Sequence, residues 1–197
     1  MAPKPDDEAL VAGYFDRSLA SLKEAAEDRA LLRLVGEIAQ AIEDSLRGGG
    51  KLLIAGNGGS AADAQHLVAE FLSRYLIDRQ PLPAVALTTD TSVLTAVGND
   101  YGFEHVFERQ VRGLGRPGDV FLAISTSGRS PNVLRALAVA GDMGLVTVGF
   151  SGAAETDMRK LCRHFLAVAS RETAIVQQIH MVAGHAICAL VERALRQ

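Results

Sequence analysis

The sequence predicts an α/β fold in which a doubly wound, five-stranded parallel sheet carries helices on both faces, with a helical extension at the N-terminus. Two patterns lead to this prediction. Short apolar runs alternate with helical patterns along most of the 197 residues, which is typical of successive βα units. The apolar runs are nearly continuous, as in strands that are buried on both faces of a parallel sheet.

A helical pattern opens the chain. Apolar residues recur at helical spacing from about Glu8 to Leu46, and the three glycines at 48–50 end the pattern. Strands are expected at residues 51–55, 84–87, 120–125, 145–150 and 165–168. Helices are expected at about 60–76, 91–98, 104–113, 131–143, 155–162 and 173–195. The length suits one domain over residues 1–197, with about 1–48 as the extension and about 49–197 as the α/β sandwich.

The last predicted helix has more apolar residues than one sheet face can bury. They cover more than one stripe: Ile175, Val176, Ile179, Val182, Ala183, Ile187, Leu190, Val191, Ala194 and Leu195. This surplus and the amphipathic first forty residues favour helix packing between subunits. Burial of the helix inside its own chain is the alternative.

Composition excludes several classes of protein. The net charge is −3 and the basic residues are scattered, so we expect no binding to nucleic acid. No apolar run approaches the roughly 18 to 20 residues of a membrane span, and the first residues lack a signal-peptide core, so we expect a cytoplasmic protein without membrane contact. Cys162 and Cys188 have neither metal-site nor redox spacing, and no disulfide is expected.

A glycine-rich segment, Gly-Asn-Gly-Gly-Ser at 56–60, follows the first predicted strand and begins a helix. Glycines let the backbone approach a ligand, and the start of a helix offers unpaired N–H groups to an anion. The segment also fits the dinucleotide fingerprint Gly-x-Gly-x-x-Ala, although the chain has no room for a catalytic partner domain. A purely structural glycine turn is a third interpretation.

A second segment, Ser-Thr-Ser-Gly-Arg-Ser at 125–130, leaves the third predicted strand and enters a helix. Ser130 is expected to be the N-cap and Pro131 the first helical residue. The hydroxyl groups and backbone N–H groups could hold a dianion, whereas a capped turn is the simpler interpretation. Both segments follow strand ends, where ligands of open α/β sheets bind.

Reactive side chains occur on two of the predicted helices. His66 and Glu70 are four residues apart and therefore share a helix face. The pair could be part of a metal site, an acid–base pair or an ordinary surface pair. Gln177 and His185 are eight residues apart, or about 12 Å along a regular helix. One metal ion can bind both only if the helix begins after Gln177 or if they come from different subunits. Residues 99–100, Asn-Asp, form either a turn or a site for sugar hydroxyls.

These motifs together resemble the phosphoheptose isomerases of the sugar isomerase (SIS) family. The likeness covers about residues 30–195 and rests on five segments in the same order. They are Gly-Asn-Gly-Gly-Ser-Ala-Ala-Asp-Ala-Gln-His, Ala-Leu-Thr-Thr-Asp, Gly-Asn-Asp-Tyr-Gly, Ser-Thr-Ser-Gly-Arg-Ser-Pro-Asn and the late Gln-x-x-His-x-x-x-x-His. The resemblance implies a flavodoxin-like SIS domain and a homotetramer with active sites between subunits.

The resemblance also implies an activity and a site. The reaction is the conversion of sedoheptulose 7-phosphate to D-glycero-D-manno-heptose 7-phosphate through an enediol, the first step toward bacterial ADP-heptose or GDP-heptose glycan precursors. One zinc ion per subunit is held by His66, Glu70, Gln177 and His185. Glu70 is the base and His185 moves protons among the oxygens or helps to open the ring. Substrate is bound by Asn57, Gly58, Gly59, Ser60, Glu70, Asn99, Asp100, Ser125, Thr126, Ser127, Ser130 and Gln177.

Two alternatives remain at this point. A non-catalytic relative in the same family binds the replication initiator DnaA, but it lacks the Glu of the His-x-x-x-Glu pair and the second late histidine. This chain has both, as Glu70 and His185. An isomerase or sensor of another sugar phosphate is the second alternative, because the loops recognise phosphate better than chain length.

Overall fold

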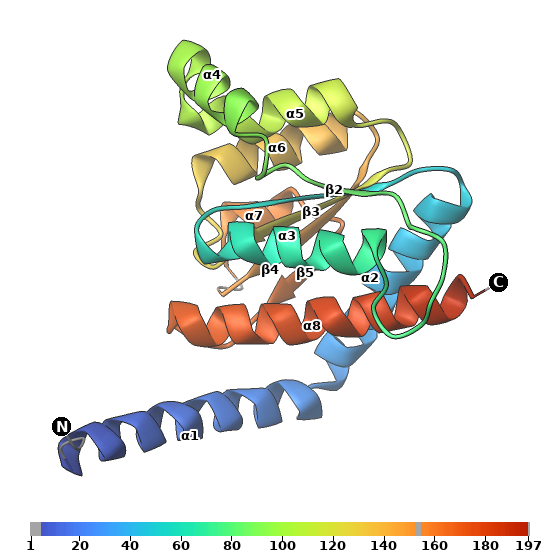
Figure 1. The fold of residues 1–197 in the computed structure, drawn as a ribbon. Coiled ribbons are helices and arrows are strands. Elements are labelled where there is room, and N and C mark those ends of the chain that lie inside the picture. The colour runs from blue at the N-terminus through green and yellow to red at the C-terminus, as the bar shows by residue number, and fades with distance from the viewer. Residues whose placement is uncertain (1–4, 153–154, 197) are drawn as a thin grey trace.

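The centre of the molecule is a five-stranded parallel sheet with strand order β2-β1-β3-β4-β5 (Figure 1). The structure is a computed structural model and describes residues 5–152 and 155–196. The strands are β1 (Leu52–Gly56), β2 (Ala84–Ala86), β3 (Val120–Ser125), β4 (Val146–Ser151) and β5 (His164–Ala167). This order is that of flavodoxin-like doubly wound sheets, which confirms the predicted fold class.

The register of the sheet brings the two candidate ligand loops together. Gly56, the last residue of β1, pairs with Ile124 of β3. Ser125, the last residue of β3, pairs with Ser151 at the end of β4. All residues of β1 and β3 are buried, as their continuous apolar sequences predict. The glycine-rich and serine-rich loops therefore leave adjacent strands at the same edge of the sheet.

Helices cover both faces of the sheet in two layers (Figure 1). One face packs against α2 (Arg29–Arg47), α3 (Gly59–Leu72) and α8 (Thr173–Ala194). The other face packs mainly against α5 (Val106–Leu114) and α6 (Pro131–Asp142), with α4 (Thr91–Tyr101) beside them. Two short helices, η1 (Phe103–His105) and α7 (Asp157–Lys160), complete the set in the part of the chain that the structure describes.

The N-terminal helical pattern is two helices rather than one. The break separates α1 (Pro5–Glu27) from α2 at Asp28, whose carboxylate accepts hydrogen bonds from the N–H groups of Ala30 and Leu31 at 2.8 and 3.1 Å. Asp28 is thus the N-cap of a new helix. Other predicted boundaries change by a few residues: α3 ends at Leu72 instead of residue 76, and α4 continues to Tyr101 instead of ending at residue 98.

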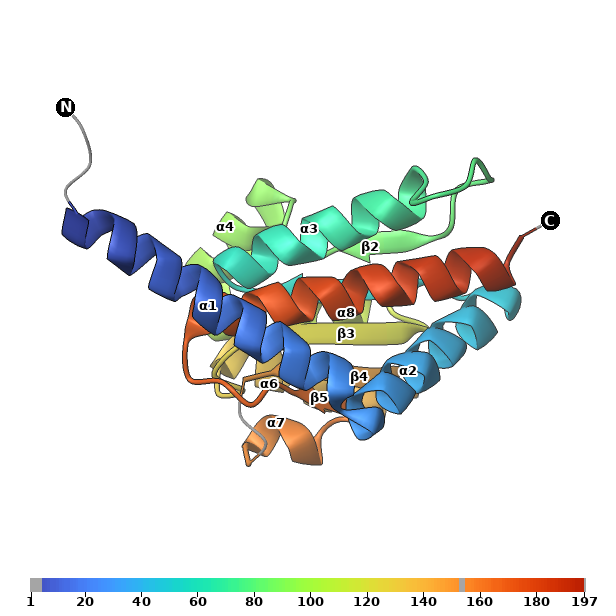
Figure 2. The same ribbon diagram turned by 90° about the horizontal axis from the view of Figure 1, so that it is seen from below.

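Helix α8 is enclosed by other parts of its own chain. It packs against α2 and α3, and α1 crosses it (Figure 2). Most of its apolar residues are buried, while Val182 is 53 % exposed. Its mean hydropathy of 1.5 over 18 residues meets the criterion for a membrane span, but half of that window is buried in the protein. Helices α1, α2 and α3 cover most of the surplus apolar residues of α8, which favours the alternative, burial inside its own chain, for those residues.

Helix α1 carries the unburied apolar surface instead. Its N-terminal half extends beyond the rest of the molecule (Figure 2). Leu10, Val11, Phe15 and Leu19 are 54 to 74 % exposed. Close to its middle, the Arg17 guanidinium forms an ion pair of 3.1 Å with Glu172, just before α8. The C-terminal part of α1 thus packs on the body of the protein, with Leu22 and Ala25 against the core, while its N-terminal half offers an apolar face to its surroundings.

Candidate active site

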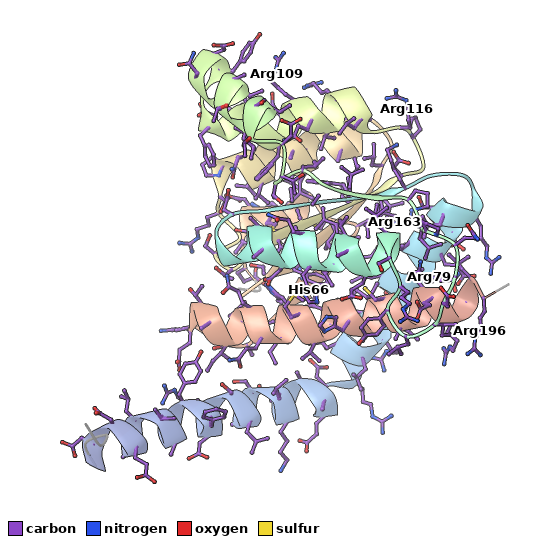
Figure 3. The ribbon with its side chains drawn as sticks, in the orientation of Figure 1. His66, Arg79, Arg109, Arg116, Arg163 and Arg196 are labelled. Atoms are coloured by element: carbon purple, nitrogen blue, oxygen red, sulfur yellow. The ribbon has the colours of Figure 1, made fainter. Side chains whose placement is uncertain are left out.

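Three side chains that the sequence singled out meet between α3 and α8. His66 Nε2 lies 3.0 Å from His185 Nε2 and 3.3 Å from Glu70 Oε1. His66 and Glu70 share one face of α3, and His185 projects from α8; Figure 3 shows His66 between the two helices. The side chains of His66 and Glu70 are 52 % and 22 % exposed, so the cluster is open to a ligand from outside.

Small residues let the two helices approach each other here. A Cβ atom added at Gly184 of α8 would lie 2.7 Å from Leu67 Cδ2 of α3. A Cβ atom at Gly59, the first residue of α3, would lie 2.5 Å from the Gln177 amide nitrogen. Both distances are below those that real Cβ atoms adopt. The end of the Gln177 side chain is free to move aside, but Leu67 is buried, so Gly184 sets the spacing of α3 and α8. The His66, Glu70 and His185 cluster depends on that spacing.

The cluster fits a divalent metal ion such as zinc. One ligand atom from each of His66, Glu70 and His185 lies within 4.8 Å of the others. Imidazole nitrogen and carboxylate oxygen are ordinary zinc ligands, and tetrahedral bonds of about 2.0–2.1 Å place two nitrogen ligands about 3.3 Å apart. The observed separation of the two Nε2 atoms, 3.0 Å, is close to this value.

Gln177 does not join these three residues within one chain. Helix α8 is continuous from Thr173 to Ala194, so Gln177 and His185 are separated by about 12 Å along its axis. The Gln177 side chain lies against Gly59 instead. Of the two arrangements that the sequence left open, a helix beginning after Gln177 is excluded. A second subunit would have to supply Gln177 to the metal cluster.

The glycine-rich loop is tied to the start of α6. Gly58 has φ +56°, a conformation that favours glycine, and α3 begins at the next residue. The amide groups of Asn57 and Asn132 exchange two hydrogen bonds of 2.9 Å each. Asn132 is 3 % exposed and Ser60 is likewise buried, so this loop has a defined shape. Asn57 is therefore held at the boundary between the two candidate ligand loops.

The serine-rich loop gathers its hydroxyl groups at the end of β3. Ser125 Oγ lies 3.0 Å from Ser130 Oγ and 3.5 Å from Ser127 Oγ. Ser130 is the N-cap residue of α6 and Pro131 its first residue, as predicted, but the Ser130 side chain makes no capping hydrogen bond. Its hydroxyl group turns toward Ser125 instead. Gly128, with φ +61°, closes the turn. This loop and the start of α6 fit a small anion such as a phosphate group.

Asn99 and Asp100 lie apart from these loops in the chain. They belong to the last turn of α4 and are exposed, and the Asn99 amide donates a hydrogen bond of 2.8 Å to Asp100. Within the described residues, their hydrogen bond to each other is the one side-chain interaction that they show. Helix α4 stands at one corner of the molecule, away from the seam of α3 and α8 (Figure 1).

Burial shifts the pKa of several ionisable groups in the protein, one of them beside the cluster. Desolvation raises the pKa of Asp63, one turn before His66, while the nearby His66 opposes this shift. Asp63 Oδ2 is buried and has no hydrogen-bond partner in the described part of the chain. Burial lowers the pKa of His180 to about 4, against a weaker contribution from the Ser151 backbone. Cys162 and Cys188 are free, as expected, and burial raises the pKa of each thiol to about 12.

Sequence reasoning missed three residues that support the candidate site. The Tyr75 ring stacks on His185, with centroids 5.4 Å apart and planes 12° from parallel. Asn132 ends the serine-rich motif, but only the structure shows its pairing with Asn57. Glu192 is 2 % exposed, and its carboxyl group within an otherwise apolar helix pattern was the available signal for an important buried charge.

Comparisons with known proteins agree with this geometry. The SIS domain family matches residues 13–152. The chain is 55 % identical over 190 residues to the phosphoheptose isomerase of Bradyrhizobium sp. (strain ORS 278), covering 96 % of each chain. The phosphoheptose isomerase structure from Neisseria gonorrhoeae has a TM-score of 0.88 at 40 % identity, covering 94 % of this chain and 98 % of that chain. The corresponding structure from Francisella tularensis has a TM-score of 0.91 at 34 % identity, covering 95 % and 98 %.

Proposed function

The chain belongs to the SIS domain family, among its phosphoheptose isomerases, and from this premise we propose that its substrate is sedoheptulose 7-phosphate. The product is D-glycero-D-manno-heptose 7-phosphate, a precursor of bacterial ADP-heptose or GDP-heptose glycans. The observation that carries the proposal is the meeting of His66, Glu70 and His185 on α3 and α8, where α3 begins at the glycine-rich loop and the serine-rich loop leaves the adjacent strand at the same sheet edge. An aldose–ketose isomerase needs both a proton-transfer group and a grip on phosphate.

Binding of the substrate is divided between the loops. The serine-rich loop holds the phosphate with Ser125, Thr126, Ser127 and Ser130, because the gathered hydroxyl groups and the start of α6 complement a dianion. The glycine-rich loop, with Asn57, Gly58, Gly59 and Ser60, contacts the sugar end. Gln177 lies against Gly59 and adds an amide to that side. The reacting carbons then lie toward α3 and α8.

Proton transfer falls to Glu70 and His185. Glu70 removes a proton from the carbon beside the substrate carbonyl, which gives an enediol, and returns a proton to the neighbouring carbon. His185 moves protons among the oxygens, and His66 lies between it and Glu70. The open face of the cluster lets a sugar chain reach these side chains.

Zinc is the metal we propose for the site, one ion per subunit. His66, Glu70 and His185 would hold it, with Gln177 joining from a second subunit. A zinc ion held there would supply Lewis-acid chemistry, which favours negative charge on the substrate oxygens.

We further propose that residues 1–197 form a single SIS domain that assembles as a homotetramer in the cytoplasm. The apolar face of α1 supports assembly, since Leu10, Phe15 and Leu19 are exposed together. The separation of Asn99 and Asp100 from the cluster supports active sites that combine residues of two subunits. The initiator-binding alternative gains no support, because Glu70 and His185, which that relative lacks, converge on His66.

The proposal is tested by incubating the purified, zinc-supplemented protein with sedoheptulose 7-phosphate and following the heptose 7-phosphate by NMR. We expect turnover by the unaltered protein and a loss of kcat of roughly 100- to 10,000-fold in Glu70→Gln, the range for a missing general base. Glu104→Gln, an exposed carboxylate on η1, is the matched control and should retain activity. No turnover by the unaltered protein would contradict the substrate, and an active Glu70→Gln would contradict the role of Glu70.

A further inference from the structure

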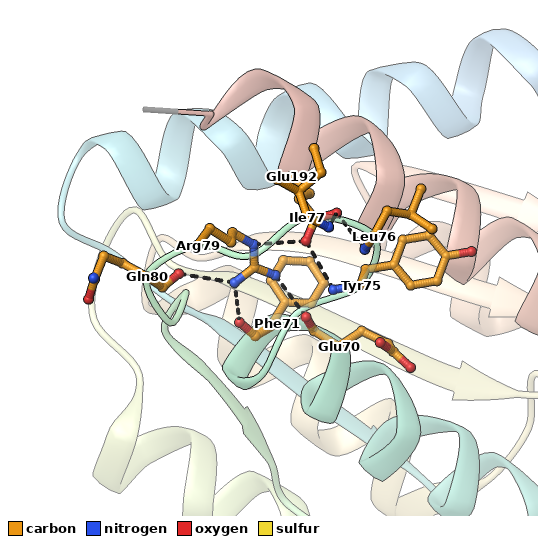
Figure 4. A network of polar contacts seen from close by, with 8 residues as sticks. All are labelled: Glu70, Phe71, Tyr75, Leu76, Ile77, Arg79, Gln80 and Glu192. Atoms are coloured by element: carbon orange, nitrogen blue, oxygen red, sulfur yellow. Dashed lines mark hydrogen bonds and ion pairs between the residues drawn. The ribbon is translucent and has the colours of Figure 1, made fainter.

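A buried carboxylate on α8 organises the loop that follows α3. Residues 73–83 connect α3 to β2 and pass beside the C-terminal half of α8 (Figure 4). The Glu192 carboxylate accepts hydrogen bonds from three successive backbone N–H groups, those of Tyr75, Leu76 and Ile77, at 2.9, 2.7 and 3.0 Å. Glu192 therefore fixes the backbone of this part of the loop.

Arg79 connects the same carboxylate to the end of α3. Its Nε lies 3.1 Å from Glu192 Oε1, and the two side chains are 9 % and 2 % exposed. Its terminal nitrogens donate to the backbone carbonyls of Glu70 and Phe71 at 2.8 and 2.9 Å (Figure 4). These carbonyls belong to the last turn of a helix, where a cation is favourable. Arg79 thus links two elements: the last turn of α3, which contains Glu70, and Glu192 of α8.

The charge on Glu192 is well compensated. Desolvation alone would raise the pKa of this carboxyl group, but the three N–H donors and Arg79 hold the pKa below its usual range. A buried carboxylate without such partners would be strongly unfavourable. Because an apolar residue at this position would pack without that cost, the carboxylate indicates a need for a fixed loop conformation rather than for burial alone.

The loop places an aromatic ring on a site residue. Tyr75, whose N–H is bound by Glu192, stacks its ring on the His185 imidazole with planes 12° from parallel. His185 is also held edge-on by the His66 ring, with centroids 5.1 Å apart. The imidazole of His185 is therefore confined on two sides, and the Tyr75 side is set by a loop that is not part of the substrate or metal site described above.

We propose that Tyr75 and Glu192 are positioning residues: Glu192, with Arg79, holds residues 75–77 so that the Tyr75 ring keeps the His185 imidazole turned toward His66 and Glu70. Neither residue touches the reacting atoms. Their effect reaches the chemistry through the orientation of His185 and through the register of α3 against α8. The expected effects on zinc binding and turnover rest on the proposed function. The expected orientation of His185 does not, because it is measured without metal or substrate.

Three variants separate positioning from general stability. Tyr75→Leu removes the aromatic face, Tyr75→Phe keeps it, and Glu192→Gln removes the charge that holds the loop. Leu76→Ala is the matched control, since the Leu76 side chain is 70 % exposed on the same loop. For each protein we would measure the zinc dissociation constant by competition with a chromogenic chelator, kcat and KM for sedoheptulose 7-phosphate, and the His185 ring orientation in a metal-free crystal structure.

We expect Tyr75→Leu and Glu192→Gln to weaken zinc binding and to lower kcat by roughly 10-fold or more, as removal of outer partners of metal-bound histidines does. The KM should stay within about twofold, because the phosphate loop is untouched, and the His185 ring should turn away from His66. Tyr75→Phe and Leu76→Ala should resemble the unaltered protein. The proposal is overturned if His185 keeps its orientation in Tyr75→Leu and Glu192→Gln, or if Tyr75→Phe is as impaired as Tyr75→Leu. If the unaltered protein neither binds zinc nor turns over the substrate, the proposed function is wrong. The positioning role of Tyr75 and Glu192 is then still tested by the orientation of the His185 ring.

Discussion

One buried histidine, His180, is expected to make the free energy of unfolding depend on pH. His180 is 1 % exposed, packs its ring 5.4 Å from that of Phe150, and has its pKa lowered by burial to about 4. In the unfolded chain its pKa would be near 6.5. As the pH falls from about 6.5 to about 4, the unfolded chain therefore binds a proton that the folded protein does not. The free energy of unfolding must decrease over this range.

The prediction is that His180 contributes about 3 kcal/mol to the loss of unfolding free energy between pH 7 and pH 4, at about 1.4 kcal/mol per pKa unit. His180→Gln removes this titration. Urea unfolding at both pH values should show a smaller decrease for His180→Gln than for the unaltered protein, although the variant is less stable at pH 7. Equal decreases in the two proteins would show that folding does not lower the pKa of His180.

At the same scale, the sequence predicted the chemistry of the site better than its geometry. The spacing of His66 and Glu70 was sufficient to predict that they face one another, because four residues make about one helical turn. The contact of both with His185 depends on the packing of α3 on α8, which no local pattern reports. The roles of Tyr75 and Glu192 were missed for the same reason, since their partners are 110 to 117 residues away.

At the scale of elements, the seam between α3 and α8 depends on glycine. Gly184 lies inside α8, where glycine is less favourable than alanine by about 1 kcal/mol. The closeness of Leu67 explains its presence, because a Cβ atom at Gly184 would lie 2.7 Å from Leu67 Cδ2. Glycine at this position lowers the intrinsic stability of α8 but allows the close packing of α8 on Leu67 of α3, which brings His185 to His66.

Gly184→Ala should therefore lower the free energy of unfolding by about 1–3 kcal/mol, the usual range for overpacking a tight contact. It should also lower kcat, because separation of the helices moves His185 from Glu70. Gly36→Ala is the matched control: Gly36 lies inside α2 with nothing within 4 Å of an added Cβ atom, so the change should be neutral or stabilising. Chemical denaturation and the isomerase assay measure both effects. A Gly184→Ala protein as stable as Gly36→Ala would disprove the tight seam.

The secondary-structure elements were more predictable than their contacts. All five strands were expected within one residue of their bounds, because buried parallel strands leave continuous apolar runs. The break at Asp28 was missed because the apolar period continues across it, although Asp28 is itself an N-cap residue type. The enclosure of α8 depends on α1 crossing it, and long-range packing of this kind has no periodic signal in either helix.

At the scale of the whole molecule, one chain leaves its candidate site incomplete. Asn99 and Asp100 are exposed on α4, and Gln177 is too far along α8 to reach the cluster of His66, Glu70 and His185. The exposed apolar residues of α1 provide a surface for assembly. A symmetric oligomer places the same surface on every subunit, so residues that are distant within one chain can meet across an interface. The proposed sharing of active sites between subunits would account for both observations.

Mixing of inactive variants tests this arrangement. We predict that Glu70→Gln and Asp100→Asn, each nearly inactive alone, regain activity when their subunits are co-assembled with two different affinity tags and purified as mixed oligomers. If Glu70 and Asp100 of one site come from different subunits, random mixing leaves about a quarter of the sites with both residues intact. The control pairs Glu70→Gln with His66→Gln. Since Glu70 and His66 contact each other on the same helix, that mixture should stay inactive. Mixed oligomers of the first pair without recovered activity would place Asp100 in the same subunit as Glu70 and would remove the main reason for a shared site.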